Sequence, residues 1–345
     1  MADNSEPSSD VLSSSNESVV QYHGFWSHKC FLQGTEEMRS EFEARSDDII
    51  LASSFKTGTT WIKALVYAIL TCKDFDLEDP AYPLNQTSPH ELVPNLEIQL
   101  YGPFANLTPE SVSLFPRVFH THVPYQALPD SIKSSGCKII YVARNPKDTF
   151  VSLWEMVVNK LDNKNAYVSK DEALEGFCRG FYHSGPFADH VTSYWRERKK
   201  RNILCLTYED LKADPVACIR VLSDFIGSSW VKEEDMKNIA RKCSFESLSQ
   251  IEANKNGELN LRGIHLRTDS FFREGKVGGW KKSLTAEMNA MMDKMIEEKL
   301  SVVADLGLQF KYELADGDGE LDEQSKKTEE IKLLGRCSLF GDLGA

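Results

Sequence analysis

The segment FKTGTTW, residues 55–61, holds the residue types that bind phosphate groups. Gly58 lets a turn curl around an anion, Lys56 adds positive charge, and a helix starting here would add backbone N–H donors. Hydroxyl donors come from Thr57, Thr59 and Thr60. The glycine-lysine order differs from the loop of nucleotide triphosphatases. The segment is therefore either a phosphate-binding loop or an ordinary capped helix start, with Trp61 as a stacking platform or a core residue.

A second candidate is the segment YVARNPKD, residues 141–148. Arg144 follows an apolar run, and a guanidinium there is suited to bidentate capture of a phosphate. Ser152, a turn and a half into the expected helix, has a hydroxyl that would donate towards the same group. The alternative is a structural ion pair between Arg144 and Asp148 that closes the turn.

Two histidines occur in FHTHVP, residues 119–124. In an extended segment His120 and His122 project to the same side. The sequence offers no further ligands at metal-site spacing, so we expect no metal. A neutral imidazole can instead accept a proton from an attacking hydroxyl. Either ring otherwise has a structural role.

The segment FFREGKVGGWKK, residues 271–282, is a basic loop interrupted by glycines and flanked by aromatic residues. It would hold an anionic group beside an aromatic ring, or it is a charged surface loop. Four segments suited to anions in one acidic chain predict a ligand with at least two phosphates and an aromatic base.

Three buried apolar runs, residues 49–52, 137–143 and 203–207, are each followed by a polar turn and a helical pattern. This repetition predicts an α/β fold in which helices flank a central parallel sheet. Ligands of such sheets bind at the carboxyl ends of the strands, where all these polar turns lie. A phosphate-binding strand–loop–helix at residues 49–71 is therefore expected.

The chain has 345 residues and a net charge of −12, so a general nucleic-acid binder is not expected. We expect no membrane span and no secretory signal, because no apolar run is long enough and the N-terminus lacks an apolar core. The scattered cysteines predict a reduced, cytoplasmic protein. We expect a Ser-rich disordered tail at residues 1–20, one domain at 21–313 and an acidic tail at 314–345.

These segments, together with PHELVP (89–94), SGPFADHVTSYW (184–195) and CSFESL (243–248), resemble the plant branch of the cytosolic sulfotransferases. The resemblance covers residues 22–312. It implies a single α/β domain that transfers a sulfuryl group from 3′-phosphoadenosine 5′-phosphosulfate (PAPS) to a hydroxyl of a small molecule. It also implies that the reaction uses no metal.

Residue roles follow from the resemblance, position by position. It implies that His122 is the catalytic base and that Lys56 acts on the leaving oxygen. Cofactor contacts are implied for Lys56, Thr57, Gly58, Thr59, Thr60, Trp61, Arg144, Ser152, Tyr208, Cys243, Ser244, Phe245, Phe271, Arg273, Glu274 and Gly275.

The chain departs from the family pattern at several positions. Phe55 replaces a proline and Thr57 a serine, which keeps the chemistry of the turn. Glu274 stands where the family has lysine, and Gly279 where it has aspartate. The carboxylate of Glu274 either faces the cofactor phosphate, weakening binding, or turns outward to pair with a lysine, Lys276 or Lys281.

The family's dimer motif is not reproduced after Lys281, so we expect a monomer. Two other functions are open: a kinase-type transferase, disfavoured by the missing G-K-[ST], and a non-catalytic nucleotide-binding member of the family. The acceptor is expected to be a largely hydrophobic plant metabolite such as a flavonoid, steroid or hydroxyjasmonate. The acceptor is expected to be chosen by loops at residues 99–107, 156–168 and 258–269.

Overall fold

The computed structural model describes residues 19–160, 169–261, 264–308 and 310. Most of the two predicted tails lies outside these ranges, but strand β1 already begins at Val19, two residues before the predicted domain boundary. The strands are β1 Val19–Tyr22, β2 Phe25–His28, β3 Ile49–Ser53, β4 Val118–Thr121, β5 Lys138–Ala143, β6 Ile203–Thr207, β7 Glu258–Leu261 and β8 Ile264–Arg267.

The helices alternate with the strands along most of the chain. They are α1 Lys29–Glu41, α2 Thr59–Thr71, α3 Pro83–Gln86, α4 Pro89–Leu92, α5 Asp130–Ser134, α6 Pro146–Lys160, α7 Lys170–Arg179, α8 Phe187–Glu197, α9 Tyr208–Ala213, α10 Pro215–Ile226, α11 Glu233–Lys242, α12 Phe245–Gln250, α13 Glu252–Lys255 and α14 Ala286–Asp305. A π-helical turn at Leu96–Leu100 and short 3₁₀ turns complete the fold.

Four parallel strands form the central sheet, in the order β4-β3-β5-β6. The two antiparallel pairs, β1-β2 and β7-β8, lie outside it. Because the chain leaves β3 for β4 on one side and then crosses to β5 on the other, the carboxyl end of β3 is the topological switch point where ligands bind. The predicted α/β architecture with a parallel sheet is confirmed.

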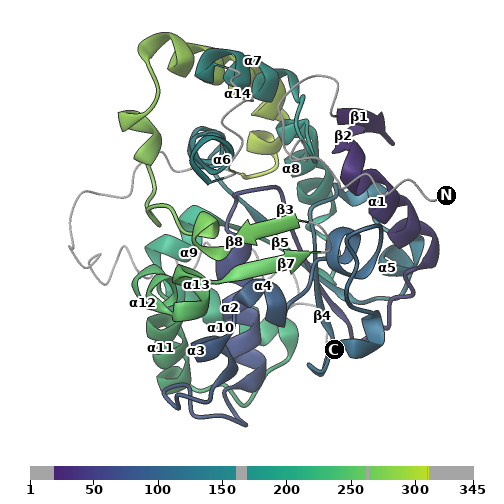
Figure 1. Ribbon diagram of the computed structural model, residues 1–345, viewed down its shortest axis with the longest axis vertical. Coiled ribbons are helices and arrows are strands. Elements are labelled where there is room, and N and C mark those ends of the chain that lie inside the picture. The colour runs from purple at the N-terminus through teal and green to yellow at the C-terminus, as the bar shows by residue number, and fades with distance from the viewer. Residues whose placement is uncertain (1–18, 161–168, 262–263, 309, 311–345) are drawn as a thin grey trace, which may run out of the picture.

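Helices cover both faces of this sheet, as Figure 1 shows. Alternate strand residues pack into two separate apolar clusters, one with α2, α10 and α11 and the other with α8 and α14. Burial on both faces explains why these strands read as continuous apolar runs in the sequence rather than as alternating patterns.

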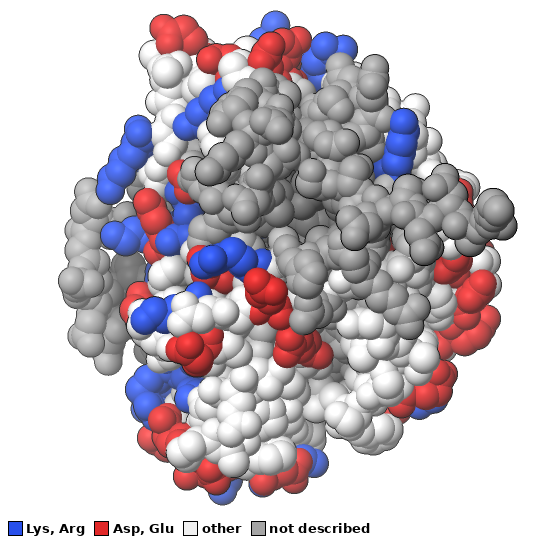
Figure 2. Space-filling view, in the orientation of Figure 1, with Lys and Arg blue, Asp and Glu red and all other residues white. Residues whose placement is uncertain are grey.

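Charged side chains of both signs share the surface. On the face drawn in Figure 2, the Lys and Arg side chains of the described residues are interspersed with Asp and Glu and form no continuous stripe. In the described ranges, no helix is both long enough and apolar enough to cross a membrane.

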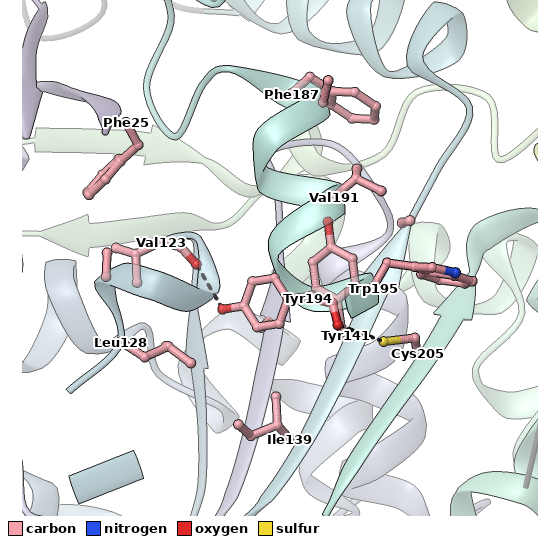
Figure 3. Close-up of a cluster of buried hydrophobic side chains, with 14 of the residues drawn as sticks. Phe25, Val123, Leu128, Ile139, Tyr141, Phe187, Val191, Tyr194, Trp195 and Cys205 are labelled. Atoms are coloured by element: carbon pink, nitrogen blue, oxygen red, sulfur yellow. Dashed lines mark hydrogen bonds between the residues drawn. The ribbon is translucent and has the colours of Figure 1, made fainter. Parts of the chain in front are cut away.

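Aromatic side chains fill the core between the sheet and α8 (Figure 3). Tyr141 of β5 stacks on Tyr194 of α8, with ring centroids 4.3 Å apart and planes 7° apart. The buried Tyr194 hydroxyl donates to the carbonyl of Val123, 2.8 Å away. This hydrogen bond fixes the chain immediately after His122, so the core also holds one of the predicted site residues in place.

Candidate active site

The loop between β3 and α2 curls as the sequence predicts. Lys56 has a φ of 64° and Gly58 a φ of 113°, both in the left-handed region. A Cβ at Gly58 would lie 3.0 Å from Cδ2 of Tyr208, so glycine is required by both conformation and space. Gly58 is also the N-cap of α2, whose first N–H groups therefore point at the loop.

The threonine hydroxyls of this loop have different partners. Thr57 donates inward, to the carbonyls of Ser54 (2.8 Å) and Val142 (3.1 Å), so its hydroxyl supports the loop from behind. Oγ1 of Thr59 lies 2.7 Å from Oγ of Ser53. Oγ1 of Thr60 lies 2.9 Å from Nε2 of His90. Only Thr59 and Thr60 reach the cavity described below.

Arg144 follows β5 and joins two loops. Its Nη1 donates to the Lys56 carbonyl (3.1 Å) and its Nη2 to the Lys276 carbonyl (3.0 Å). The guanidinium lies over the Tyr208 ring, 4.3 Å from its centroid, and its buried Nε has no hydrogen-bond partner. The alternative pairing with Asp148 is not formed, because the Asp148 carboxylate accepts backbone N–H groups from Gly278 and Trp280.

Asp148 therefore anchors the basic loop to the start of α6. Within that loop Gly275 has a φ of 64°, and a Cβ there would lie 2.4 Å from Cγ of Phe245. Arg273 lies near three carboxylates at 3.7–4.0 Å, those of Asp148, Glu155 and Glu274. Its buried Nη2 has no hydrogen-bond partner.

His122 is held from four directions. Its backbone N–H donates to Oε1 of Glu97 (2.7 Å), and its carbonyl accepts from Nε2 of His190 (3.0 Å). The ring stacks on Phe55, with centroids 3.9 Å apart. Ring Nδ1 lies 2.8 Å from the Ser53 carbonyl, which only accepts, so Nδ1 carries the proton and Nε2 has the lone pair.

The environment of His122 also keeps it neutral. Burial lowers its pKa well below the usual value, and the hydrogen bond to Ser53 only partly opposes this. His120 is fully buried behind it, between Ser53 and Asn95. Only His122 of the two lines the cavity, and its Nε2 has the lone pair.

One cavity brings the predicted site together. All the predicted site residues line this cavity except Thr57 and Glu274. Among the lining residues, Lys56 donates from Nζ to the Ser270 carbonyl, 2.9 Å away. Glu274 instead turns its carboxylate to Arg273, with Oε2 3.8 Å from Nη1. Cys243 lines it as a thiol, since burial raises its pKa to about 12.

Three polar lining residues were missed from the sequence: His90, Lys212 and Glu246. Lys212 lies one helical turn after Tyr208 in α9, and this spacing would have predicted that both side chains face the same side. His90 lies within the PHELVP segment, whose only signal in the sequence is the family resemblance. Apolar lining residues include Phe31, Phe55, Ile98, Met156, Leu261 and Leu266. Met156, Leu261 and Leu266 come from two of the segments expected to choose the acceptor, and the structure places them near the end of α6 and in the β7-β8 pair rather than in loops.

The cavity fits an anion with an aromatic base. Arg144 Nε, Arg273 Nη2 and Trp61 Nε1 are buried donors without hydrogen-bond partners in the structure, and such groups are costly unless a ligand or water accepts from them. Trp61 and Tyr208 lie edge to face, with centroids 5.5 Å apart, beside Phe245. Among the described residues no group of three or more His, Cys, Asp or Glu is arranged to hold a metal ion.

Comparison with known proteins identifies the family of the chain. Residues 46–303 match the family model of the sulfotransferase domain. Cytosolic sulfotransferase 16 of Arabidopsis thaliana is 39% identical over 292 residues, which cover 82% of this chain and 85% of that protein. Flavonol 3-sulfotransferase of Flaveria bidentis is 39% identical over 291 residues, covering 82% and 91%.

Solved structures show the same fold. A putative steroid sulphotransferase of Arabidopsis thaliana superposes with a TM-score of 0.65 at 33% identity, covering 85% of this chain and 89% of that one. A mouse sulfotransferase complexed with PAP gives a TM-score of 0.65 at 28% identity, covering 84% and 98%. The resemblance stated from the sequence is confirmed, and the chain belongs to the sulfotransferase family.

Proposed function

We propose that the protein transfers a sulfuryl group from PAPS to a hydroxyl of a small, largely hydrophobic acceptor. The observation that carries this proposal is that His122, whose contact with the Ser53 carbonyl leaves the lone pair on Nε2, lines the same cavity as Lys56. The unpartnered Arg144 and Arg273 donors suit the phosphate of such a co-substrate. Bound there, PAPS would supply the electrophilic sulfur.

The residues of the chain do the remaining work. His122 Nε2 accepts the proton of the acceptor hydroxyl as the new S–O bond forms and the bond from sulfur to the phosphate oxygen breaks. Lys56 places an ammonium where negative charge develops on the departing oxygen. The helix start after Gly58 and the side chains of Arg144 and Arg273 orient the anion.

The acceptor class follows from the other half of the cavity. Phe31, Ile98, Met156, Leu261 and Leu266 are apolar, so they suit a ring system that presents one reactive hydroxyl. A flavonol sulfotransferase among the relatives supports a plant phenol, and a putative steroid sulphotransferase among the solved structures supports a steroid. We propose a cytosolic location, because relatives are named cytosolic sulfotransferases. We also propose a monomer, because the dimer motif of the family is not reproduced after Lys281.

The test is a transfer assay with ³⁵S-labelled PAPS against a panel of flavonols, steroids and hydroxylated fatty-acid derivatives. Labelled product with at least one apolar hydroxyl acceptor, formed in the presence of EDTA, supports the proposal. Activity only with a divalent cation and a nucleoside triphosphate would instead support a kinase-type transferase. Light scattering of the protein as it elutes from a size-exclusion column measures its mass, and a monomer would give the 39.0 kDa of one chain.

A further inference from the structure

A fully buried lysine lies directly behind the phosphate-binding loop. Lys63, in the second turn of α2, is 1% exposed, and its Nζ lies 3.3 Å from Nδ1 of His90. Burial lowers its pKa to about 7, and the charge of Glu97 partly opposes that shift. Burying an amine lowers the stability of the folded protein unless the amine is hydrogen-bonded or paired. Lys63 has no role in the proposed transfer reaction as described above.

His90 connects Lys63 to the cavity. The ring belongs to α4, lines the cavity and stacks on Phe271 with centroids 3.9 Å apart. Its Nδ1 faces Lys63, and its Nε2 lies 2.9 Å from Oγ1 of Thr60. The three side chains therefore form a continuous path from the interior of α2 to the loop.

The direction of the hydrogen bonds follows from the donors available. In its charged form Lys63 only donates, so Nδ1 of His90 then accepts from it. Burial, with the nearby Lys63 charge, lowers the pKa of His90 and keeps the ring neutral, so its one proton is on Nε2. That N–H donates to Thr60 Oγ1, so the hydroxyl proton of Thr60 does not point at His90. Because Thr60 lines the cavity, we infer that this proton points into the cavity.

We propose that Lys63 and His90 are positioning residues that set the Thr60 hydroxyl as a hydrogen-bond donor to an anionic oxygen held by the loop at residues 55–61. This inference rests on the proposed function, because it requires an anionic ligand there. Without Lys63, His90 could carry its proton on Nδ1, and the Thr60 hydroxyl would then donate to Nε2 and present only lone pairs to the ligand, which repel an anion.

The same arrangement recurs at the neighbouring threonine. Asn95 Nδ2 lies 3.2 Å from Nδ1 of His120, whose Nε2 lies 2.9 Å from Oγ of Ser53. Ser53 Oγ in turn lies 2.7 Å from Oγ1 of Thr59. With the amide donating, His120 carries its proton on Nε2 and leaves the Ser53 proton for Thr59. Two imidazoles behind the loop thus direct two adjacent hydroxyls towards the cavity.

The first test measures the tautomer of His90 by NMR of the full-length protein labelled with ¹⁵N-histidine, without ligand. The signal of His90 is the one that His90→Phe removes. We expect the neutral Nε2–H form in the wild type and a mixture of tautomers in Lys63→Met. The spectra are recorded at pH 6, below the pKa of Lys63, where a neutral Nδ1–H form or a charged ring would overturn the proposal without any binding measurement.

The second test is a double-mutant cycle on binding of 3′,5′-adenosine bisphosphate, followed by calorimetry. Thr60→Val should weaken binding about tenfold or more, since it removes a hydrogen bond to a charged group. Lys63→Met keeps the imidazole but frees it to accept from the Thr60 hydroxyl, so it should lose up to a similar factor. The double variant of Lys63 and Thr60 should bind within about twofold of Thr60→Val alone, because both changes remove the same hydrogen bond.

Losses that multiply in the double variant would overturn the positioning role, since Lys63 would then act on the ligand by another route. A wild type that does not bind the probe would refute the proposed function, and the tautomer measurement separates that failure from this one. Thermal unfolding of each variant shows whether weak binding reflects loss of folded protein.

Discussion

The carboxylate of Glu274 offers the sharpest test of how this protein binds its anion. It lies 3.8 Å from Nη1 of Arg273, a guanidinium that lines the cavity. Glu155 lies 3.7 Å from the same atom. A phosphate at this site must therefore share Arg273 with these two carboxylates as well as with Asp148, and all three repel it. We expect removal of the Glu274 or the Glu155 charge to strengthen nucleotide binding.

The size of the effect is taken from the contact of Glu274 with Arg273, for which the phosphate competes, and from the exposure of Glu274. Two unit charges at about 4 Å interact by ~1 kcal/mol in water and by ~4 kcal/mol at an effective dielectric of 20. The Glu274 side chain is 42% exposed, so the lower figure applies. About 1 kcal/mol corresponds to roughly fivefold in affinity. Glu274→Gln should tighten nucleotide binding by roughly fivefold. Glu274→Lys changes the charge by two units and should tighten it by roughly 25-fold.

The assay is calorimetric titration with 3′,5′-adenosine bisphosphate at low and high salt. The gain should shrink at high salt, because exposed charges are screened. Glu155→Gln is the matched variant and should tighten binding to a similar extent. Glu175→Lys, on the exposed face of α7, controls for net charge and should change little. Glu274→Lys binding no tighter than wild type at low salt would refute the reasoning.

Four further predictions concern the same cavity. His122→Ala should lower turnover by about 10²–10⁴-fold and leave nucleotide binding within a few-fold of wild type, as expected for a positioned base. His120→Ala should have a far smaller effect on turnover. A His122→Ala variant that keeps a tenth of the wild-type turnover would refute the role. Because burial lowers the pKa of His122, its base form persists below pH 6.5, so kcat/KM should stay level between pH 7.5 and 6; a fall with an apparent pKa near 6.5 would contradict this. Lys56→Ala should reduce kcat more than nucleotide affinity, and equal losses would make Lys56 a ground-state anchor. Gly275→Ala should weaken nucleotide binding at least tenfold by pushing on Phe245, whereas Gly136→Ala, at a similar φ but in open space, should not; equal effects would rule out that contact.

Much of the fold was predictable because the sheet is buried on both faces. The apolar runs at 49–52, 137–143 and 203–207 correspond to β3, β5 and β6, with ends within one residue. The fourth strand, β4 at Val118–Thr121, was expected only as an extended segment. Its histidine interrupts the apolar pattern, and only the structure shows that Ser53 and Asn95 satisfy that ring.

The site was predictable where residue type alone determines placement. Lysine, arginine and glycine at the carboxyl ends of strands converge on one cavity because parallel strands share that edge. Side-chain direction was not predictable: Thr57 donates to two carbonyls behind the loop, and Glu274 turns to Arg273 rather than into the cavity.

Residues that act through others were the hardest to find. Lys63 lies in the apolar run of α2, where a lone lysine carries no motif. His90 reaches it only because α4 packs against α2 in the folded chain. Contacts of this kind depend on tertiary packing, which neither periodicity nor local spacing encodes.

The most direct test of the account follows transfer of ³⁵S from PAPS to an apolar hydroxyl acceptor by the wild type and by His122→Ala, with nucleotide binding measured on the same samples. We predict labelled product from the wild type in EDTA, almost none from His122→Ala, and nucleotide binding by both proteins. A wild type that binds neither PAPS nor 3′,5′-adenosine bisphosphate, or a His122→Ala variant that transfers label at a tenth of the wild-type rate or more, would contradict the proposed function.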